Sequence, residues 1–364
     1  PKLLQIPAKS AVRFSSSYKK SPNHQVIRTP IFCSPITVDE EPFIMCLKKD
    51  RAIFKGGFIL KYTLLGSLGN IGRVVVPALV NAGNDVTVIS SNSKRSEQIR
   101  EVGAQPAIGN MADSKFLANQ FEGADAVYLM VATRPSDSIF EDTEKQGRVF
   151  AEAIKRSGVK NVVDLSSIGA NNPQAGVLYA YHWIEDQLKE LEDVNVAFIR
   201  PVGFYSNLYA NINTIRADHA IYSNIPETIT QRWAAPQDIA AVVLKLLQHV
   251  PVGTSVHYVY SDAFSTQKFI ETLQDTLSMP DLHFVSISDE QAEQSMVDRG
   301  VSKKLAQLFI KMSELERHPE KLYADLDNQT TNIGEVKLAD FVKAFSVAYQ
   351  DQNNGPHANT LVDQ

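Results

Sequence analysis

The apolar residues of this chain fall into short β-type runs that alternate with amphipathic, helix-type segments. The first run begins at Lys61 and ends at Gly66, and the second, DVTVIS, covers Asp85–Ser90. A near-continuous apolar run at Ala124–Thr133 is typical of a strand that is buried on both faces of a parallel sheet. The other predicted strands lie in AQPAIGNMAD, at Val159–Ser167 and at Val194–Phe204. This alternation predicts an α/β fold with a doubly wound parallel sheet, the Rossmann fold.

Helix-type segments fill the intervals between the predicted strands. Three short ones follow the first three strands, as RVVVPALVNAG, SEQIREVG and SKFLANQFEG, and a long one covers Glu141–Ser157. The segment LYAYHWIEDQLKELE predicts a further helix before the sixth strand. Beyond Phe204 the sequence predicts three more helices, WAAPQDIAAVVLKLLQ with Pro236 near its first turn, FSTQKFIETLQDTL and LADFVKAFSVAYQ, and a short strand at HYVYS.

The pattern divides the chain into four parts. Residues 59–204 contain six predicted strands, enough for an NAD(P)-binding Rossmann domain. Residues 205–350 are expected to form a smaller, mixed α/β substrate lobe, with some of its strands and helices joining the Rossmann core. Residues 1–58 are expected to be an unstructured leader, and residues 351–364 a loose tail.

Charge sets the leader apart from the rest of the chain. Residues 1–58 contain ten Lys and Arg and four Asp and Glu, a net charge of +6. Because the whole chain has a net charge of −5, residues 59–364 have a net charge of −11. An acidic body argues against nucleic acid or an anionic membrane as a partner. Both cysteines, Cys33 and Cys46, lie in the leader, so the body is expected to form no disulfide and no cysteine-based metal site. No apolar run reaches the roughly 18 residues of a transmembrane helix.

Two interpretations of the leader compete. Residues 1–38 contain no acidic residue, several Ser and scattered Lys and Arg, as organelle transit peptides do. Alternatively, the leader is upstream sequence translated in frame, because Lys55-Gly56-Gly57 can be encoded by a purine-rich ribosome-binding stretch and Leu60 stands just beyond it as a non-AUG start. We favour the second interpretation, and with it a cytoplasmic location. Native protein whose N-terminal sequence begins near Pro1 would contradict it.

The glycine turn after the first strand predicts a site for an anionic ligand. Gly66, Gly69 and Gly72 follow one another at three-residue spacing and lead into a helix. Glycine tolerates the positive φ of such a turn, and a side chain at Gly69 would block the ligand. The helix N-terminus offers unpaired N–H groups and a positive dipole end to a pyrophosphate. The spacing differs from the GxGxxG of classical dehydrogenases, and glycine-rich turns also precede helices that bind nothing.

The residues after the second strand favour NADP(H) over NAD(H). A site for NAD has Asp or Glu at this point to hold the ribose 2′-OH. Here the chain reads Ser90, Ser91, Asn92, Ser93, Lys94 and Arg95. Hydroxyls followed by two cations suit a 2′-phosphate, and no carboxylate is present to repel it. The alternative interpretation is a polar loop that opens a solvated helix.

Four features of the body resemble the NmrA-like group of atypical short-chain dehydrogenases/reductases, whose quinone oxidoreductases and redox-sensing regulators share one fold. They are GSLGNIG, GNMAD after the third strand, the segment YHWIEDQLKEL, and FIRPVGFYSN followed by APQDIA. The resemblance covers about Lys61 to Tyr349. It identifies no substrate.

The resemblance implies a set of cofactor-binding residues. The pyrophosphate would be wrapped by Gly66, Leu68, Gly69, Asn70, Ile71 and Gly72, the adenosine ribose would be surrounded by Ser90, Ser91 and Lys94, and Asn110 would lie by the adenine. Val131, Ala132 and Thr133 would line the cofactor at the end of the fourth strand, and Pro201, Gly203 and Phe204 would approach the nicotinamide. These positions agree with the rule that ligands lie outside the carboxyl ends of parallel strands.

The sequence lacks the Tyr-x-x-x-Lys pair in which typical short-chain dehydrogenases lower the pKa of the tyrosine. Tyr181 is followed at this spacing by Glu185, a carboxylate that would raise the pKa of the tyrosine. We therefore expect no tyrosinate mechanism. The candidate catalytic residues are Tyr181, the adjacent His182, and Ser167, which ends the fifth strand where the family has a hydroxyl. Alternatively, the two aromatics are wall or surface residues and Ser167 caps the following turn.

Hydride delivery to a quinone does not require a strong protein acid, because the reduced oxygen can take its proton from water. The missing lysine thus argues against alcohol or sugar oxidoreduction. We expect an NADPH-dependent oxidoreductase that transfers hydride to a small quinone-like or carbonyl acceptor, with Trp183, Phe204 and Tyr205 as flat apolar surface for it. The alternative is a non-catalytic NADP(H)-binding redox sensor or regulator that acts through a protein partner.

Other function classes find little support in the sequence. A serine hydrolase of the α/β type is disfavoured because no G-x-S-x-G elbow is present. No metal site is expected, since the eight histidines are dispersed. The expected partner is thus a small-molecule acceptor, with no nucleic acid and no membrane, and a homodimer or a regulatory protein partner stays open.

Overall fold

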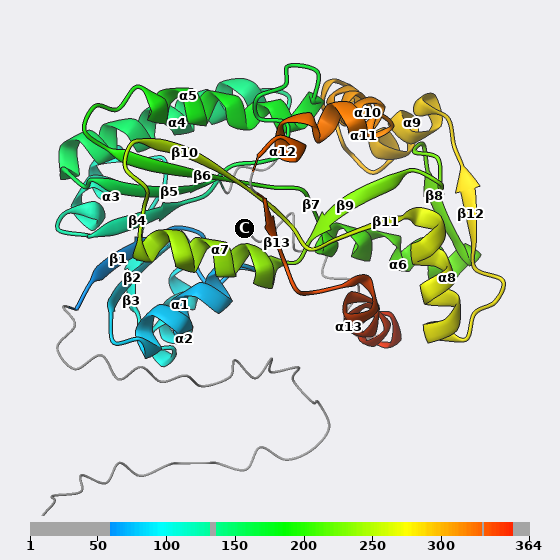
Figure 1. The fold of residues 1–364 in the computed structure, drawn as a ribbon, viewed down its shortest axis with the longest axis horizontal. Coiled ribbons are helices and arrows are strands. Elements are labelled where there is room, and N and C mark those ends of the chain that lie inside the picture. The colour runs from blue at the N-terminus through cyan, green and yellow to red at the C-terminus, as the bar shows by residue number, and fades with distance from the viewer. Residues whose placement is uncertain (1–58, 132–135, 330, 352–364) are drawn as a thin grey trace, which may run out of the picture. The chain divides into compact units, whose positions relative to one another are not determined.

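The computed structural model describes residues 59–131, 136–329 and 331–351, all within the unit Gly56–Gln364. Its main sheet has the strand order β13-β10-β6-β5-β4-β1-β2-β3, and every neighbouring pair is parallel (Figure 1). Six strands form the Rossmann order: β1 Lys61–Leu64, β2 Asp85–Ser90, β3 Gln105–Ile108, β4 Ala126–Leu129, β5 Asn161–Leu165 and β6 Asn195–Pro201. The predicted doubly wound parallel sheet is confirmed.

Two strands from the C-terminal half extend this sheet beyond β6. Strand β10 (Thr254–Tyr260) pairs with β6, and the two-residue strand β13 (Asn332–Ile333) pairs with β10 at the edge. A sheet made only of residues 59–204 would therefore lack one side. The domain boundary at residue 204 stays a prediction.

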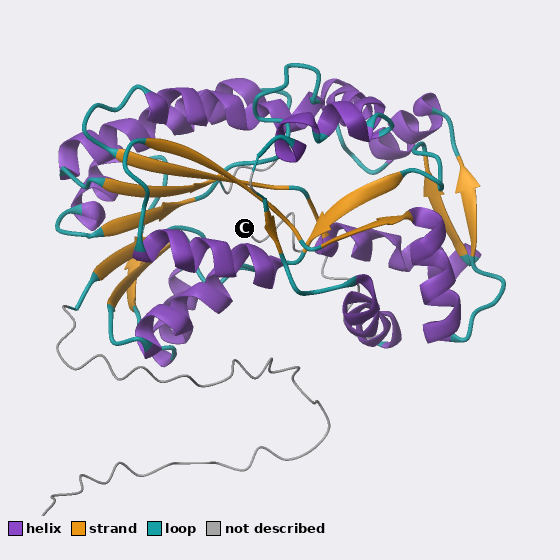
Figure 2. Ribbon diagram, in the orientation of Figure 1, coloured by secondary structure: helices purple, strands orange, loops and turns teal. Residues whose placement is uncertain are grey.

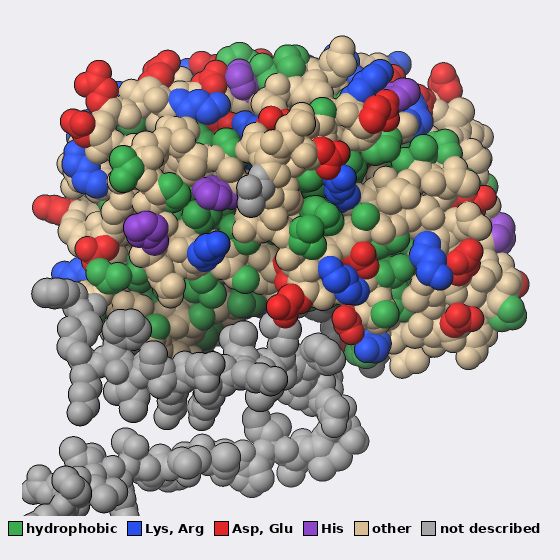
Figure 3. Space-filling model, viewed as in Figure 1, with side chains coloured by type: hydrophobic (Ala, Val, Ile, Leu, Met, Phe, Trp, Pro, Cys, Tyr) green, Lys and Arg blue, Asp and Glu red, His purple; other side chains and the backbone are tan. Residues whose placement is uncertain are grey.

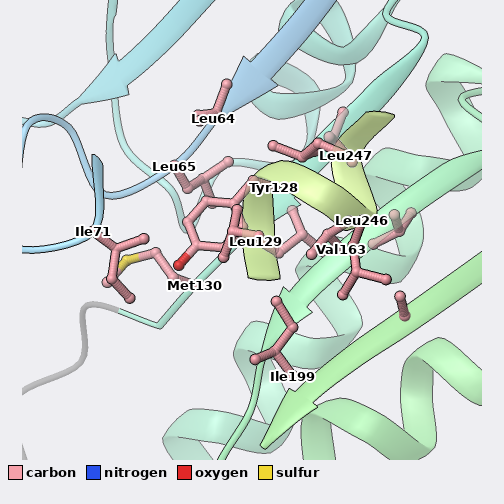
Figure 4. Packing of buried hydrophobic residues seen from close by; sticks show 14 of the residues in the cluster. Leu64, Leu65, Ile71, Tyr128, Leu129, Met130, Val163, Ile199, Leu246 and Leu247 are labelled. Atoms are coloured by element: carbon pink, nitrogen blue, oxygen red, sulfur yellow. The ribbon is translucent and has the colours of Figure 1, made fainter. Parts of the chain in front are cut away.

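Helices cover both faces of the main sheet (Figure 2). Helices α3 (Ser114–Phe121), α4 (Ile139–Ser157) and α5 (His182–Lys189) lie on one face, and α1 (Gly72–Asn81), α2 (Ser96–Glu101) and α7 (Pro236–Gln248) lie on the other. Strand β4 is buried at all four positions, as its apolar run predicts. Figure 4 shows how Leu246 and Leu247 of α7 pack with Leu129, Val163 and Ile199 of the central strands.

The remaining described elements form a second region beside the main sheet. A three-stranded sheet has the order β11-β9-β7, and a parallel pair joins β12 to β8. Its strands are β7 Gly203–Phe204, β8 Ala220–Ser223, β9 Thr230–Ala234, β11 Asp262–Ser265 and β12 His283–Ser286, and its helices are α6 Ile212–Asp218, α8 Thr266–Leu277, α9 Asp289–Asp298, α10 Lys303–Glu316, α11 Pro319–Leu322, α12 Ala324–Asp327 and α13 Leu338–Gln350. An aromatic core that includes Tyr205, Phe264 and Phe341 joins α6, α8 and α13 to β8 and β11. Buried residues of α10, α11 and α12 belong to other clusters.

Several predicted elements differ from the structure. The helix expected at residues 178–192 is a 3₁₀ segment, Gly176–Tyr181, followed by the shorter α5, because α10 packs closely on this segment. A Cβ atom on Gly176 would lie 2.1 Å from the carbonyl oxygen of Leu308. The strand expected at Val194–Phe204 breaks at Val202 into β6 and β7, which belong to different sheets. Trp233 and Ala234 belong to β9 rather than to the following helix.

The termini and the surface complete the description. The predictions for the leader, and for the tail beyond Asp351, fall outside the described residues. Of the helices described, none combines the length and the apolar character that a membrane span needs. On the face shown in Figure 3, acidic and basic side chains of the described residues are interspersed.

Candidate functional site

The glycine turn joins β1 to α1, and its three glycines have different reasons to be glycine. Gly66 has φ 89° and Ser67 follows in the left-handed region with φ 52°. A Cβ atom on Gly72 would lie 2.1 Å from the backbone oxygen of Ser67, so the turn itself excludes a side chain there. A Cβ atom on Gly69 would meet only the Gly66 oxygen, at 3.1 Å. Gly69 is thus the glycine that the fold needs least.

The N-terminus of α1 has free hydrogen-bond donors. No partner within the described residues accepts from the backbone N–H groups of Asn70, Ile71 or Gly72. The N-cap residue Ile71 gives no side-chain hydrogen bond, and the first turn of α1 contains no acidic residue. The positive end of the helix dipole is therefore uncompensated by the helix itself, which fits the pyrophosphate of a dinucleotide.

A cavity of about 110 Å³ lies next to this turn, at the carboxyl ends of β1, β4, β5 and β6. It brings together ten of the predicted site residues: Gly66, Gly69, Asn70, Ile71, Gly72, Val131, Ser167, Tyr181, Pro201 and Phe204. It is also lined by Leu65, Tyr128, Met130, Leu165 and Ser166. None of the described lining residues carries a charge.

Seven further predicted site residues, all within the described part of the chain, do not line this cavity. Leu68 lies in the glycine turn and Gly203 in β7, and Ser90 is buried with its hydroxyl bonded to the backbone of Asn92. Ser91, Lys94 and Asn110 are exposed, and the side-chain oxygen of Asn110 accepts from the Ala112 amide. The imidazole of His182 faces Asp186, with 3.0 Å between Nε2 and Oδ2. Ala132 and Thr133 fall outside the described residues, and all these roles stay predictions.

Tyr128 is a wall residue that the sequence interpretation missed. Figure 4 shows its hydroxyl directed toward Ile71 and Met130, beside the glycine turn. Its signal in the sequence is a phenol within the aliphatic run of the fourth strand. A tyrosine in such a run is a candidate for a residue that lines a pocket, because a buried tyrosine requires a hydrogen-bond partner for its O–H.

Two phenols of the cavity, Tyr128 and Tyr181, are neutral hydrogen-bond donors. Neither hydroxyl has a partner among the described residues. Burial, and next the charge of Asp164, raises the pKa of both tyrosines. The raised pKa of Tyr181 is therefore confirmed, but its expected cause is wrong. The carboxylate that contributes is Asp164 on β5, whereas Glu185 is paired with Arg200 and Lys189.

Glu185 is held by a buried network behind the cavity wall. Its carboxylate accepts from Arg200 Nε at 2.8 Å and from Arg200 Nη2 at 2.6 Å, and Lys189 Nζ lies at 3.1 Å. Burial alone would raise the pKa of Glu185, but the hydrogen bonds and charge of Arg200 outweigh burial and lower this pKa. Ser166 Oγ also donates to Glu185, at 2.6 Å. Ser166 thus offers only lone pairs to the cavity. The hydroxyl of the half-buried Ser167 has no partner among the residues that the structure describes.

The protein-family model described as NAD(P)H-binding matches residues 66–250, from the glycine turn to the end of α7. The chain belongs to the NAD(P)H-binding family. This match confirms the predicted family resemblance and NAD(P)H as the cofactor. It also supports the general prediction of an NAD(P)H-dependent oxidoreductase.

Two curated proteins are similar to this chain over different lengths. An NAD(P)H azoreductase of Xenophilus azovorans is 25% identical over 291 residues, which cover 79% of this chain and 98% of that protein. A photosystem II assembly factor, Ycf39 of Trieres chinensis, is 26% identical over 199 residues, which cover 51% of this chain and 59% of that protein.

Solved structures show the same fold at lower identity. The NADPH-dependent quinone oxidoreductase QOR2 from Escherichia coli has a TM-score of 0.64 at 15% identity, covering 78% of this chain and 99% of that one. The triphenylmethane reductase of Citrobacter sp., solved with NADP(H), has the same TM-score, identity and coverage. These likenesses establish the Rossmann-type architecture for nearly the whole described body.

Proposed function

We propose that this protein is an NADPH-dependent oxidoreductase of the NmrA-like type that reduces a small, neutral quinone-like or carbonyl acceptor. The observation that carries the proposal is one cavity in which the α1 N-terminal amides meet the hydroxyls of Tyr128, Ser167 and Tyr181. None of these groups has a hydrogen-bond partner in the described part of the chain. When bound, NADPH supplies the hydride. The chain's own residues hold it, orient the acceptor and provide hydrogen-bond donors.

The predicted holders of the cofactor form two groups. The amides of Asn70, Ile71 and Gly72 would donate to the pyrophosphate, which can approach because Gly69 has no side chain. The exposed ammonium of Lys94 would meet a 2′-phosphate at the end of β2, together with the Ser91 hydroxyl. This second group supports NADPH over NADH.

The cavity wall supports a neutral, flat acceptor. Met130, Val131, Leu165 and Phe204 supply apolar surface, and the described wall offers no charged group to compensate a charged substrate. The hydroxyls of Tyr181 and Ser167 would donate to an acceptor oxygen on which negative charge develops. A tyrosinate is excluded as a base, because the raised pKa keeps Tyr181 neutral near neutral pH.

The Tyr181→Phe variant is expected to reduce kcat about tenfold, with little change in KM for the acceptor. This loss is smaller than that of a sole oxyanion donor, because Tyr128 and Ser167 remain. Steady-state kinetics with a quinone measure it. A kcat equal to that of the unmodified protein would remove Tyr181 from the mechanism.

The Lys94→Ala variant is expected to raise the Kd for NADPH about tenfold and to leave the Kd for NADH unchanged. One charge-assisted contact to an exposed phosphate accounts for a change of about 1.4 kcal/mol. Calorimetric titration with both coenzymes measures the difference, and Lys145→Ala, at an exposed position of α4, is the matched control. An equal change for both coenzymes would reject a role in 2′-phosphate recognition.

One experiment tests the whole proposal. The purified protein is titrated with NADPH and NADH, and the tighter coenzyme is then offered with quinones, enones and azo compounds. We expect NADPH to bind more tightly and to be consumed with at least one uncharged acceptor. Binding without turnover of any acceptor would favour the redox sensor instead, and no binding of either coenzyme would reject both.

A further inference from the structure

Ser166 is a hydroxyl of the cavity wall whose hydrogen already has an acceptor. The residue follows directly after β5, and its backbone N–H donates to the Ile199 oxygen of β6 at 2.8 Å. Its side chain lines the cavity although the residue is only 3% exposed, and its Oγ donates to Glu185 Oε1 at 2.6 Å. The proposed reaction uses Tyr181 and Ser167 and leaves Ser166 without a role.

The direction of this hydrogen bond is fixed by the charge of Glu185. An ionised carboxylate can only accept, so the hydrogen of Ser166 must point toward it. Glu185 has no exposed side-chain surface, and Arg200 keeps it ionised by donating to it from Nε at 2.8 Å and from Nη2 at 2.6 Å. Arg200 is held in turn by the Tyr258 hydroxyl, which accepts from Nη1 at 2.8 Å. Turning the serine hydrogen toward the cavity would therefore cost a charge-assisted hydrogen bond.

The side of Ser166 that faces the cavity thus presents lone pairs. Lone pairs bind an N–H or O–H group of a ligand and repel a carbonyl oxygen. The hydroxyls of Tyr128, Ser167 and Tyr181 differ from it, because each still has a hydrogen to donate within the described part of the wall. The cavity therefore combines donating hydroxyls with a hydroxyl that can only accept.

The proposed function brings two molecules into this cavity, and they differ in what they can offer to Ser166. A quinone-like or carbonyl acceptor has oxygen atoms that only accept until it has been reduced. The nicotinamide end of NADPH carries a carboxamide, whose nitrogen has hydrogens to donate. A buried lone pair without a donor is costly, so the carboxamide is the better partner for Ser166.

Resting on the proposed function, we infer that Ser166 binds the carboxamide N–H of the nicotinamide and that Glu185 holds the serine hydroxyl in its accepting orientation. Ser166 would then be a cofactor-binding residue in addition to the predicted ones. Glu185 does not line the cavity and acts through Ser166, so it is a positioning residue. The buried pair of Glu185 and Arg200 thereby gains a role in cofactor recognition as well as in stability.

The first test measures binding and needs no turnover. NADP⁺ is compared by calorimetric titration with its acetylpyridine analogue, in which a methyl group replaces the nitrogen of the carboxamide. The unmodified protein should bind NADP⁺ about tenfold more tightly, because the methyl group leaves Ser166 without a donor. Ser166→Ala should bind both coenzymes with equal affinity, mainly through weaker binding of NADP⁺. Ser295→Ala, at an exposed position of α9, is the matched control and should keep the preference.

The second test turns the serine hydroxyl round. In Glu185→Gln the new amide nitrogen can donate to Ser166 Oγ, which frees the serine hydrogen to point into the cavity. The preference for NADP⁺ over the analogue should therefore fall although Ser166 is intact. A merely structural role of Glu185 would weaken the binding of both coenzymes equally, and an unchanged ratio of the two Kd values would refute the positioning.

The outcomes for the unmodified protein decide the inference even if a variant does not fold. Equal affinities for NADP⁺ and the analogue would overturn it and leave the proposed reductase standing. The tenfold preference without turnover of any acceptor would support it and favour the redox sensor as the function. No binding of either coenzyme would reject both the inference and the proposed function.

Discussion

Replacing Gly69 by valine is expected to weaken NADPH binding at least about 100-fold while the protein stays folded. The valine side chain would occupy the space through which the pyrophosphate reaches the free amides of Asn70, Ile71 and Gly72. The loss of two or more hydrogen bonds to a charged group, each worth about 1.5–3 kcal/mol, accounts for a change of this size. Calorimetric titration measures the affinity, and thermal unfolding tests the fold.

Two further variants make this result specific. Ala82→Val places the same side chain at the exposed C-terminal end of α1 and should leave the affinity unchanged. Gly72→Ala should lower the unfolding temperature as well as the affinity, because its Cβ atom would lie 2.1 Å from the Ser67 carbonyl oxygen. Full affinity in Gly69→Val would show that the cofactor does not lie against the turn.

Replacing Arg200 by methionine is expected to lower the free energy of unfolding by about 3–5 kcal/mol. Glu185 has no exposed side-chain surface and Arg200 has 5%, so the variant leaves a carboxylate buried without its main partner. Arg200 Nη1 also donates to the Tyr258 hydroxyl at 2.8 Å, and this bond would be lost too. Urea unfolding followed by circular dichroism gives the free energy.

A double variant and an exposed pair provide the controls. Replacing Glu185 by leucine together with Arg200→Met should recover most of the stability, because no unpaired charge is then buried. Arg156→Met breaks a pair with Glu152 whose side chains are about half exposed, and should cost less than about 1 kcal/mol. Equal losses for Arg200→Met and Arg156→Met would contradict a special role of burial.

The stabilisation that the Glu185–Arg200 pair provides depends on pH. The pKa of Glu185 is lower in the folded protein than in the unfolded chain, so its contribution is present above the unfolded pKa. It is lost as the pH falls through the folded pKa. The double variant should therefore lose less stability than the unmodified protein on acidification.

The strands and the glycine turn were predictable because their signals are local. The predicted second strand has the bounds of β2, and LADFVKAFSVAYQ has the bounds of α13, since alternation or helical periodicity lies in adjacent residues. The 3₁₀ segment Gly176–Tyr181 was not predictable, because α10, more than a hundred residues later, determines its shape. The break at Val202 depends likewise on pairing with β9.

Those parts of the candidate site that the backbone pattern forms were predictable from the sequence. Contacts between side chains that are far apart in the sequence were not. Ten predicted residues meet in one cavity, because parallel strands bring their carboxyl ends to one edge. The partner of Glu185 was missed, since Glu185 lies on α5, Arg200 lies fifteen residues later on β6, and only the fold joins the two. Asp164 was missed for the same reason, because nothing in NVVDL tells which side chains surround the aspartate.

The position of β13 bears on how this protein emerges from the ribosome. The sheet begins with Lys61, but its outermost strand consists of Asn332 and Ile333, so nearly all of the chain must leave the exit tunnel before that edge is covered. Until then β10 presents unpaired backbone groups, the kind of edge to which another nascent chain can add. A stop codon just upstream of Asn332 would thus yield a product in which the Rossmann strands are complete but the edge of β10 stays unpaired. We expect this product to aggregate.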